Sequence, residues 1–131
     1  MKFSACMTSL SVVAGLLLAG CTTQLVYIND IYLVNTCGVP LEVQSQHSTN
    51  WLPSITPRPV APGERVSVAS YKSYGEDIEE QISGRYSLTM KGPERTRLVS
   101  ADEMRHVLPD AKRERDGLQR SWTLKDGVFC P

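Results

Sequence analysis

Four cysteines and two histidines are the side chains of this sequence best suited to covalent, acid–base or metal chemistry: Cys6, Cys21, Cys37, Cys130, His47 and His106. A nucleophile needs a basic group within hydrogen-bonding reach, and a metal site needs several ligands at characteristic spacings. The sequence contains no HExxH, CxxC or GxSxG pattern and no glycine-rich phosphate loop. We therefore predict no catalytic residue, no metal ligand and no cofactor, and a protein that is not an enzyme.

The start of the chain has the composition of an export signal. Met1 and Lys2 give it a positive end, and residues 10–19 form an apolar run in which Ser11 is the only polar side chain. A helix of this length reaches roughly 15 Å, half of the roughly 30 Å of hydrocarbon that a spanning helix crosses. The run predicts a cleaved signal and not a permanent membrane span.

The apolar run ends in Leu18-Ala19-Gly20-Cys21, an aliphatic residue, two small residues and a cysteine. This junction resembles the lipobox of bacterial lipoproteins, and the resemblance covers only the leader and the cysteine. It implies a diacylglyceryl thioether on Cys21 and usually an acyl group on its new amine, which together hold a protein stably on a membrane. Thr22, in place of aspartate, points to the outer membrane by the sorting rule of enterobacterial lipoproteins. The alternative is an ordinary secretory signal with a chance cysteine.

The resemblance divides the chain into three parts. They are a signal peptide of residues 1–20, a short lipidated tether of residues 21–24, and a single β-rich periplasmic domain of residues 25–131. The tether residues that follow the cysteine reach only about 10 Å even when fully extended. We therefore expect the domain to lie close to the lipid headgroups, on the periplasmic side of the outer membrane.

The remaining cysteines predict a disulfide. Cys6 leaves with the signal and Cys21 is used by the lipid, so the mature domain keeps Cys37 and Cys130. An even pair in an exported chain is typical of a disulfide. Closing so long a loop stabilises a domain by about 4–5 kcal/mol in the chain-entropy model. The alternative is a reactive thiol at Cys37, with His106 as its base.

Composition and charge exclude several classes of protein. The 131 residues are 41% hydrophobic and 21% charged, as expected for one packed domain. Fourteen Lys and Arg balance fourteen Asp and Glu. Because nucleic-acid binding depends on a surplus of positive charge, we expect no nucleic-acid partner.

The mature chain has the pattern of β-strands, in short runs that alternate apolar with polar residues between turn residues. We expect strands over residues 25–34, 41–46, 65–71, 85–90, 95–99 and 120–125. A hairpin pinned by Cys37 is expected between the first two strands. Strands of this length and spacing favour a small antiparallel β-sandwich or partial barrel with one short helix.

The segments between the strands have their own signals. Residues 47–63 contain four prolines and predict irregular structure. Residues 76–82 predict one helical turn, and residues 110–119 a charged loop. Ser100 and Glu103 form a capping box that predicts a helix over residues 101–108.

The proline-rich loop also suggests a binding surface. Trp51 lies within it, and Tyr71 and Tyr74 follow the next strand. Exposed aromatic side chains in a rigid loop are good anchors for a protein partner or a glycan. The alternative is that Trp51 folds back and covers the open end of the core.

Charge is distributed unevenly along the mature chain. Residues 21–84 carry three basic and seven acidic groups, whereas residues 85–125 carry ten basic and six acidic groups. The acidic cluster consists of Glu76, Asp77, Glu79 and Glu80. The basic cluster consists of Arg105, Lys112, Arg113, Arg115 and Arg120. Clusters held apart by the fold would steer a charged partner, and the alternative is ordinary solvated surface.

These features favour a lipid-anchored, non-enzymatic accessory module that docks on an envelope protein through Trp51, the two tyrosines and the acidic cluster. The first alternative is an inhibitor or immunity lipoprotein, in which residues 76–80 imitate an anionic substrate of a toxin or wall-degrading enzyme. The second is a small hydrolase with His47 or His106 in a cleft, for example beside Ser121 and Asp102.

Overall fold

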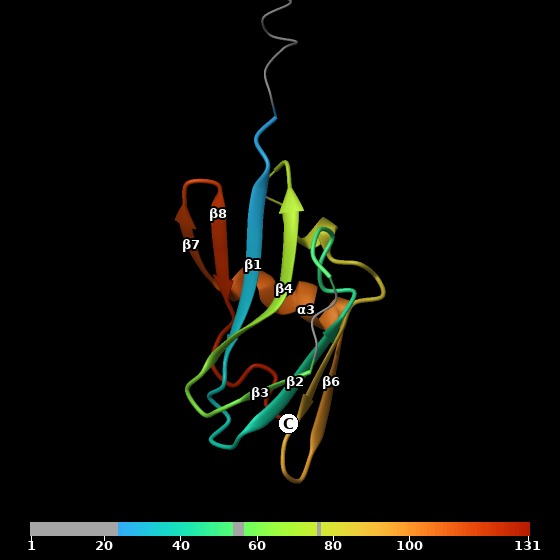
Figure 1. The fold of residues 1–131 in the computed structure, drawn as a ribbon, viewed down its shortest axis with the longest axis vertical. Coiled ribbons are helices and arrows are strands. Elements are labelled where there is room, and N and C mark those ends of the chain that lie inside the picture. The colour runs from blue at the N-terminus through green and yellow to red at the C-terminus, as the bar shows by residue number, and fades with distance from the viewer. Residues whose placement is uncertain (1–23, 54–56, 76) are drawn as a thin grey trace, which may run out of the picture.

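Figure 1 shows the computed structural model of the chain, which describes residues 24–53, 57–75 and 77–131. The strands in these residues form two four-stranded sheets. The β1 sheet contains, in spatial order, β4 (Arg65–Ser73), β1 (Tyr27–Val34), β8 (Gln119–Thr123) and β7 (Lys112–Asp116). The β2 sheet contains β3 (Arg58–Val60), β2 (Leu41–Gln46), β5 (Ser87–Lys91) and β6 (Thr96–Ser100). The predicted small β-sandwich with one short helix is confirmed for the described residues.

The core lies between the two sheets, where the alternation of the strands directs their apolar side chains. Asn29, Ile31 and Leu33 of β1 are buried, as are Leu41 and Val43 of β2. The other large buried side chains come from the remaining strands, the helical segments and the C-terminal segment: Val60, Val66, Val68, Tyr71, Ile78, Ile82, Tyr86, Leu88, Met90, Val99, Met104, Leu108, Trp122, Leu124 and Phe129.

The hairpin predicted between the first two strands is wrong. β1 pairs with β4 and β8, whereas β2 pairs with β3 and β5, so residues 35–40 cross from one sheet to the other. The pairing of β1 with β8 is also parallel, whereas the other pairs of named strands in the described residues are antiparallel. Turn residues indicate that the chain changes direction after β1, but they do not indicate which strand β2 pairs with. A strand with alternating residues can bury its apolar face in either sheet.

The charged loop predicted over residues 110–119 is also wrong, because it contains an edge strand. β7 pairs with β8 over its whole length, and its residues are all exposed. The two strands are joined by Gly117 and Leu118, with Gly117 at φ 60°, as a two-residue β-hairpin requires at its first central position. An exposed strand with no buried face shows no apolar alternation, and its charges discourage pairing with other chains.

The helical predictions are confirmed. α3 (Ala101–Val107) begins with the capping box: the Glu103 amide donates to Ser100 Oγ at 3.2 Å, and the Ser100 amide donates to Glu103 Oε2 at 2.8 Å. The helix ends at Val107, one residue earlier than predicted. Leu108 begins the short 3-10 helix η2 (Leu108–Asp110), which contains Pro109. The acidic segment contains one 3-10 turn, η1 (Glu79–Gln81).

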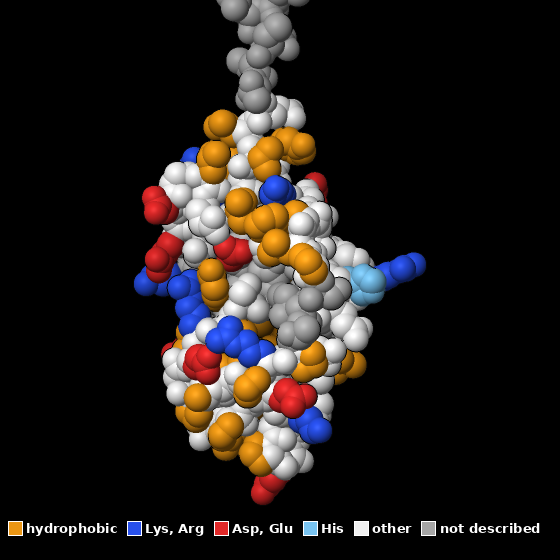
Figure 2. Space-filling view, in the orientation of Figure 1, with side chains coloured by type: hydrophobic (Ala, Val, Ile, Leu, Met, Phe, Trp, Pro, Cys, Tyr) orange, Lys and Arg blue, Asp and Glu red, His pale blue; other side chains and the backbone are white. Residues whose placement is uncertain are grey.

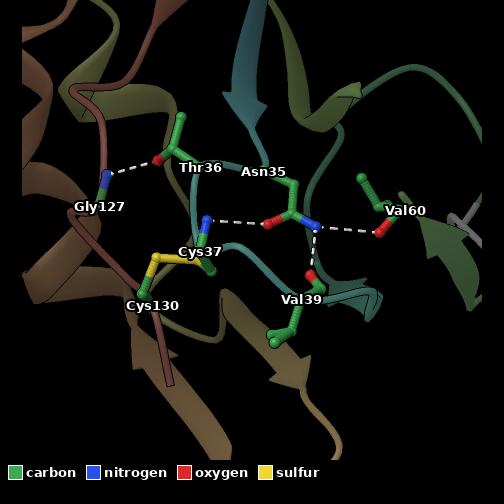
Figure 3. Close-up of a disulfide and its surroundings, with 7 residues drawn as sticks. All are labelled: Asn35, Thr36, Cys37, Val39, Val60, Gly127 and Cys130. Carbon is green, nitrogen blue, oxygen red and sulfur yellow. Dashed lines mark hydrogen bonds between the residues drawn. A yellow bond between two sulfur atoms is a disulfide. The ribbon is translucent and has the colours of Figure 1, made fainter. Parts of the chain in front are cut away.

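The predicted disulfide is present where β1 ends. Cys37 and Cys130 are bonded, with their Cα atoms 5.5 Å apart across 93 positions of sequence. Figure 3 shows the bond joining the C-terminal segment to the connection between the sheets, beside Asn35. The Asn35 amide donates to the carbonyl oxygens of Val39 at 2.8 Å and Val60 at 3.1 Å. The alternative of a free thiol at Cys37 is therefore wrong.

The predicted leader and the lipobox-like junction, including Cys21, lie outside the described residues. Within the part of the chain that the structure describes, no helix combines the length and the apolar character needed to cross a bilayer.

Candidate functional site

The loop of residues 47–53 is attached along the free edge of β4. The Ser70 amide donates to the carbonyl oxygen of Ser48 at 2.8 Å, and Thr49 forms a parallel bridge with Ser70. Two residues further along β4, Asn50 Oδ1 accepts from the Lys72 amide at 2.8 Å, and Asn50 Nδ2 donates to the Lys72 carbonyl oxygen at 2.9 Å. Because a side-chain amide carries the same donor and acceptor as a peptide group, Asn50 continues the pairing that backbone atoms begin.

Trp51 is held at the surface by this attachment. Its indole Nε1 donates to Ser70 Oγ at 3.1 Å, its own amide donates to Thr49 Oγ1 at 3.2 Å, and the Lys72 ammonium lies 4.7 Å from the ring centroid. Trp51 is 40% exposed and Leu52 is 44% exposed. The alternative in which Trp51 covers the open end of the core is therefore wrong. We call Trp51, Leu52 and Lys72 the aromatic platform.

Tyr71 does not belong to this surface, which corrects the sequence prediction. It is 1% exposed, and its hydroxyl donates to the His47 carbonyl oxygen at 3.1 Å. Burial raises the pKa of the phenol well above its ordinary value. The reason is a β-bulge: Ile31 pairs with Ala69 and Tyr32 with Ser67, so the chain gains one residue and its alternation reverses before Tyr71.

Tyr74 is exposed, at 66%, and lies two residues beyond Lys72, just after β4 ends. Because Tyr74 lies in a bend, the alternation of β4 does not extend to it, and we do not count it as part of the aromatic platform. Figure 2 shows hydrophobic side chains over the upper half of the molecule, where β1 and β4 lie in Figure 1, and others over its lower half.

The acidic and basic clusters are not separated by the fold. Asp77 and Glu80 are exposed, and Glu76 lies outside the described residues. A hydrogen bond and charge repulsion from Asp77 raise the pKa of Glu79, while the positive charge of Arg113 opposes that rise. Arg105 donates to the carbonyl oxygen of Glu79 at 3.4 Å and to that of Ile82 at 2.6 Å. Arg105 thus lies against the acidic segment and Arg113 is near enough to act on Glu79, so the two clusters adjoin in space and do not form two separate poles.

One member of the predicted basic cluster is part of the interior. Arg120 is buried, donates to Ser73 Oγ at 3.0 Å, and places its guanidinium 4.2 Å from the centroid of the Tyr27 ring. Arg115 approaches the same ring from β7, at 5.1 Å. These contacts tie the beginning of β1 to the β7–β8 hairpin, and the sequence offered no signal for them.

The two histidines lie on the surface. His106 borders an open hollow together with Asp102 and Glu103. Those carboxylates already accept hydrogen bonds, Asp102 from Arg105 at 2.9 Å and Glu103 from Arg97 at 3.0 Å. Ser121 borders a different hollow, on β7 and β8. The described residues contain no group of three or more His, Cys, Asp or Glu side chains arranged to hold a metal ion.

A polar hollow of about 370 Å³ lies next to the platform. It is lined by Leu52 together with the end of β2 and the loop that follows: Gln44, Ser45, Gln46, His47, Ser48 and Thr49. The exposed apolar side chain of Leu52 and a polar recess are therefore adjacent on this surface.

Comparison with known proteins found no family model that matches the chain, and no curated protein or solved structure that matches it. The fold and the site define the protein as a small, disulfide-bonded β-sandwich with an aromatic loop hydrogen-bonded to one sheet edge.

Proposed function

We propose that this protein is a lipid-anchored accessory module of the bacterial envelope that docks on an envelope protein through the aromatic platform, without catalysis of its own. The observation that carries the proposal is the exposed indole of Trp51, fixed by Ser70, Thr49 and Lys72. Tryptophan is among the side chains that contribute most to protein interfaces. An anchor that is already ordered loses little conformational entropy when a partner binds, so more of its burial appears as affinity.

The cellular location in the proposal rests on two independent features. The lipobox-like junction at Cys21 supports lipidation and a periplasmic face, with Thr22 favouring the outer membrane. The Cys37–Cys130 disulfide supports an oxidising compartment, because disulfides persist in the periplasm and are rare in the cytosol. Both features agree with a domain exported and then retained on a membrane.

Docking is tested by photocrosslinking in living bacteria with the full chain. p-Benzoylphenylalanine placed at Leu52, beside Trp51, is expected to give one discrete protein adduct. The same label at Leu98, an exposed leucine on β6, is the matched control and is expected to give none of it. Adding Trp51→Ala to the Leu52-labelled chain should abolish the adduct. An adduct that survives Trp51→Ala, or that forms equally at Leu98, would contradict docking through the platform.

Anchoring is tested separately by Cys21→Ala. We expect the variant to leave the membrane fraction while its circular dichroism and disulfide stay unchanged. Retention of the variant in the membrane fraction would show that something other than the lipid holds the protein there.

A further inference from the structure

Three exposed apolar side chains surround the place where β1 begins. Leu25 precedes the strand and is 55% exposed, Tyr74 is 66% exposed, and Leu118 is 45% exposed. Tyr27 pairs with Ser73, which places Tyr74 alongside the chain just before β1. On the other side of the strand, the Ile28 amide donates to the Leu118 carbonyl oxygen at 2.9 Å. Three separate segments therefore bring these side chains to one end of the β1 sheet, which we call the anchor end.

The anchor end has the chemistry of a membrane interface. Tyrosine side chains combine an apolar ring with a polar tip and are enriched where lipid chains meet water. Arg115 donates to the Tyr27 hydroxyl at 3.4 Å, and its long side chain allows the charge to reach the headgroups. Asp116, in the same hairpin, offsets that charge. A surface of this composition would be attracted to a bilayer by its apolar groups more than by its net charge.

The short length of chain between the predicted lipid and the domain indicates that the anchor end faces the membrane. Only Thr22, Thr23 and Gln24 separate Cys21 from Leu25. Three extended residues reach about 10 Å, so a lipid on Cys21 would hold the anchor end within reach of the headgroup layer. Figure 2 shows hydrophobic side chains at the end of the molecule where the described chain starts. A protein partner would have to enter that narrow space, whereas the bilayer already occupies it.

We propose that the anchor end inserts Leu25, Tyr74 and Leu118 into the headgroup region of the membrane that carries the lipid, as a second, non-covalent contact. The inference rests on the proposed function, since it takes the lipid on Cys21 as given. Two contacts fix the direction of the domain, with β1 pointing away from the bilayer. The aromatic platform, on the side of β4, is then held at a constant height above the surface.

The test places p-benzoylphenylalanine at Leu118 or at Tyr74 in the full chain, with Leu98 as the matched position. Leu98 is 65% exposed and lies on β6, away from the start of β1 in Figure 1. After illumination of intact cells, the purified protein is analysed by intact-mass spectrometry. We expect adducts of phospholipid mass at Leu118 and Tyr74 and none at Leu98. The same spectra report whether Cys21 carries its diacylglyceryl group.

Each outcome decides the inference. Lipidated chains without lipid adducts at Leu118 and Tyr74 would overturn it while leaving the proposed anchoring intact. Protein adducts at both positions would overturn it in favour of a protein contact, and equal lipid adducts at Leu98 would show that labelling reflects proximity alone. Chains without lipid on Cys21 would disprove the anchoring, and lipid adducts at the two positions would then still support insertion.

Discussion

The two ends of β1 are stabilised in different ways. Where the strand finishes, a disulfide and the three hydrogen bonds of the Asn35 side chain hold the connection between the sheets. Where the strand begins, the guanidinium groups of Arg115 and Arg120 lie over the Tyr27 ring, and the neighbouring side chains of Leu25, Tyr74 and Leu118 are exposed. The covalent constraint is thus placed far from the surfaces proposed for contact. We infer that the disulfide end supplies stability and that the anchor end and the platform are free to serve contacts.

The largest effect is expected at the disulfide end. Cys37→Ser should lower the free energy of unfolding by about 4–5 kcal/mol, because the unfolded chain regains the entropy of a loop spanning 93 positions. Denaturant unfolding measures the loss, and a thiol probe should now label Cys130. Photocrosslinking through Leu52 should persist below the unfolding transition. A variant as stable as the parent would show that the two ends do not differ as described.

Asn35→Ala is expected to have the next largest effect. The substitution leaves the carbonyl oxygens of Val39 and Val60 without their amide donor in a buried site, which costs about 2–3 kcal/mol. Thr36→Val is the matched control: it removes one exposed hydrogen bond, from the Gly127 amide, and should cost about 1 kcal/mol. Thermal unfolding of the two variants checks the order, and equal losses would contradict the role given to Asn35.

At the platform, Asn50→Ala should loosen the loop of residues 47–53 more than it lowers the free energy of unfolding of the protein. It removes both side-chain bonds to the Lys72 backbone, with an expected cost of about 1 kcal/mol. Acrylamide quenching of tryptophan fluorescence should increase, because Trp51 is exposed and Trp122 is buried. Arg58→Ala, which breaks the exposed ion pair with Glu64, should leave quenching unchanged. Unchanged quenching in Asn50→Ala would mean that the loop is ordered by other contacts.

The smallest effect is expected from Asp77→Asn. Asp77 raises the pKa of Glu79, so the folded protein binds that proton more tightly than the unfolded chain does. The resulting stabilisation is complete below the unfolded pKa of Glu79 and is lost as pH rises through the folded pKa. Asp77→Asn should lower the pKa of Glu79 and weaken this acid-side dependence, by at most about a few tenths of a kcal/mol given solvent screening. NMR titration of the Glu79 carboxyl checks the direction.

Local sequence signals predicted the fold where the interaction partners lie close in the chain. Ser100 and Glu103 are three residues apart, so the capping box was visible without the fold. The sequence analysis did not predict the hairpin of β7 and β8, because its turn residues, Gly117 and Leu118, are not one of the common hairpin pairs and β7 has no buried face to produce an apolar pattern. The exposure of Tyr71 was predicted wrongly because a β-bulge, set by pairing with β1, reverses the alternation.

For the candidate site, the sequence predicted that Trp51 and Tyr74 are exposed, as the structure shows, but it did not predict the contacts that hold Trp51. Asn50 was missed entirely, since an asparagine in a loop gives no sign that it will pair with Lys72 across the edge of a strand. Acidic and basic residues are separated along the chain, yet Arg105 lies next to Glu79 in the fold. Charge along a sequence determines charge on a surface only after the elements are placed.

The sequence by itself determined the local properties of this protein: the strand periodicity, the helix cap, the pair of cysteines Cys37 and Cys130 and the apolar run of residues 10–19 ahead of Cys21. Only the tertiary structure decided which strands share a sheet, which face Tyr71 takes, and that Leu25, Tyr74 and Leu118 meet at one end. The physical reason is that backbone preferences and side-chain alternation act between near neighbours. Sheet pairing joins residues far apart in the chain, and its register decides which side chains finally face water.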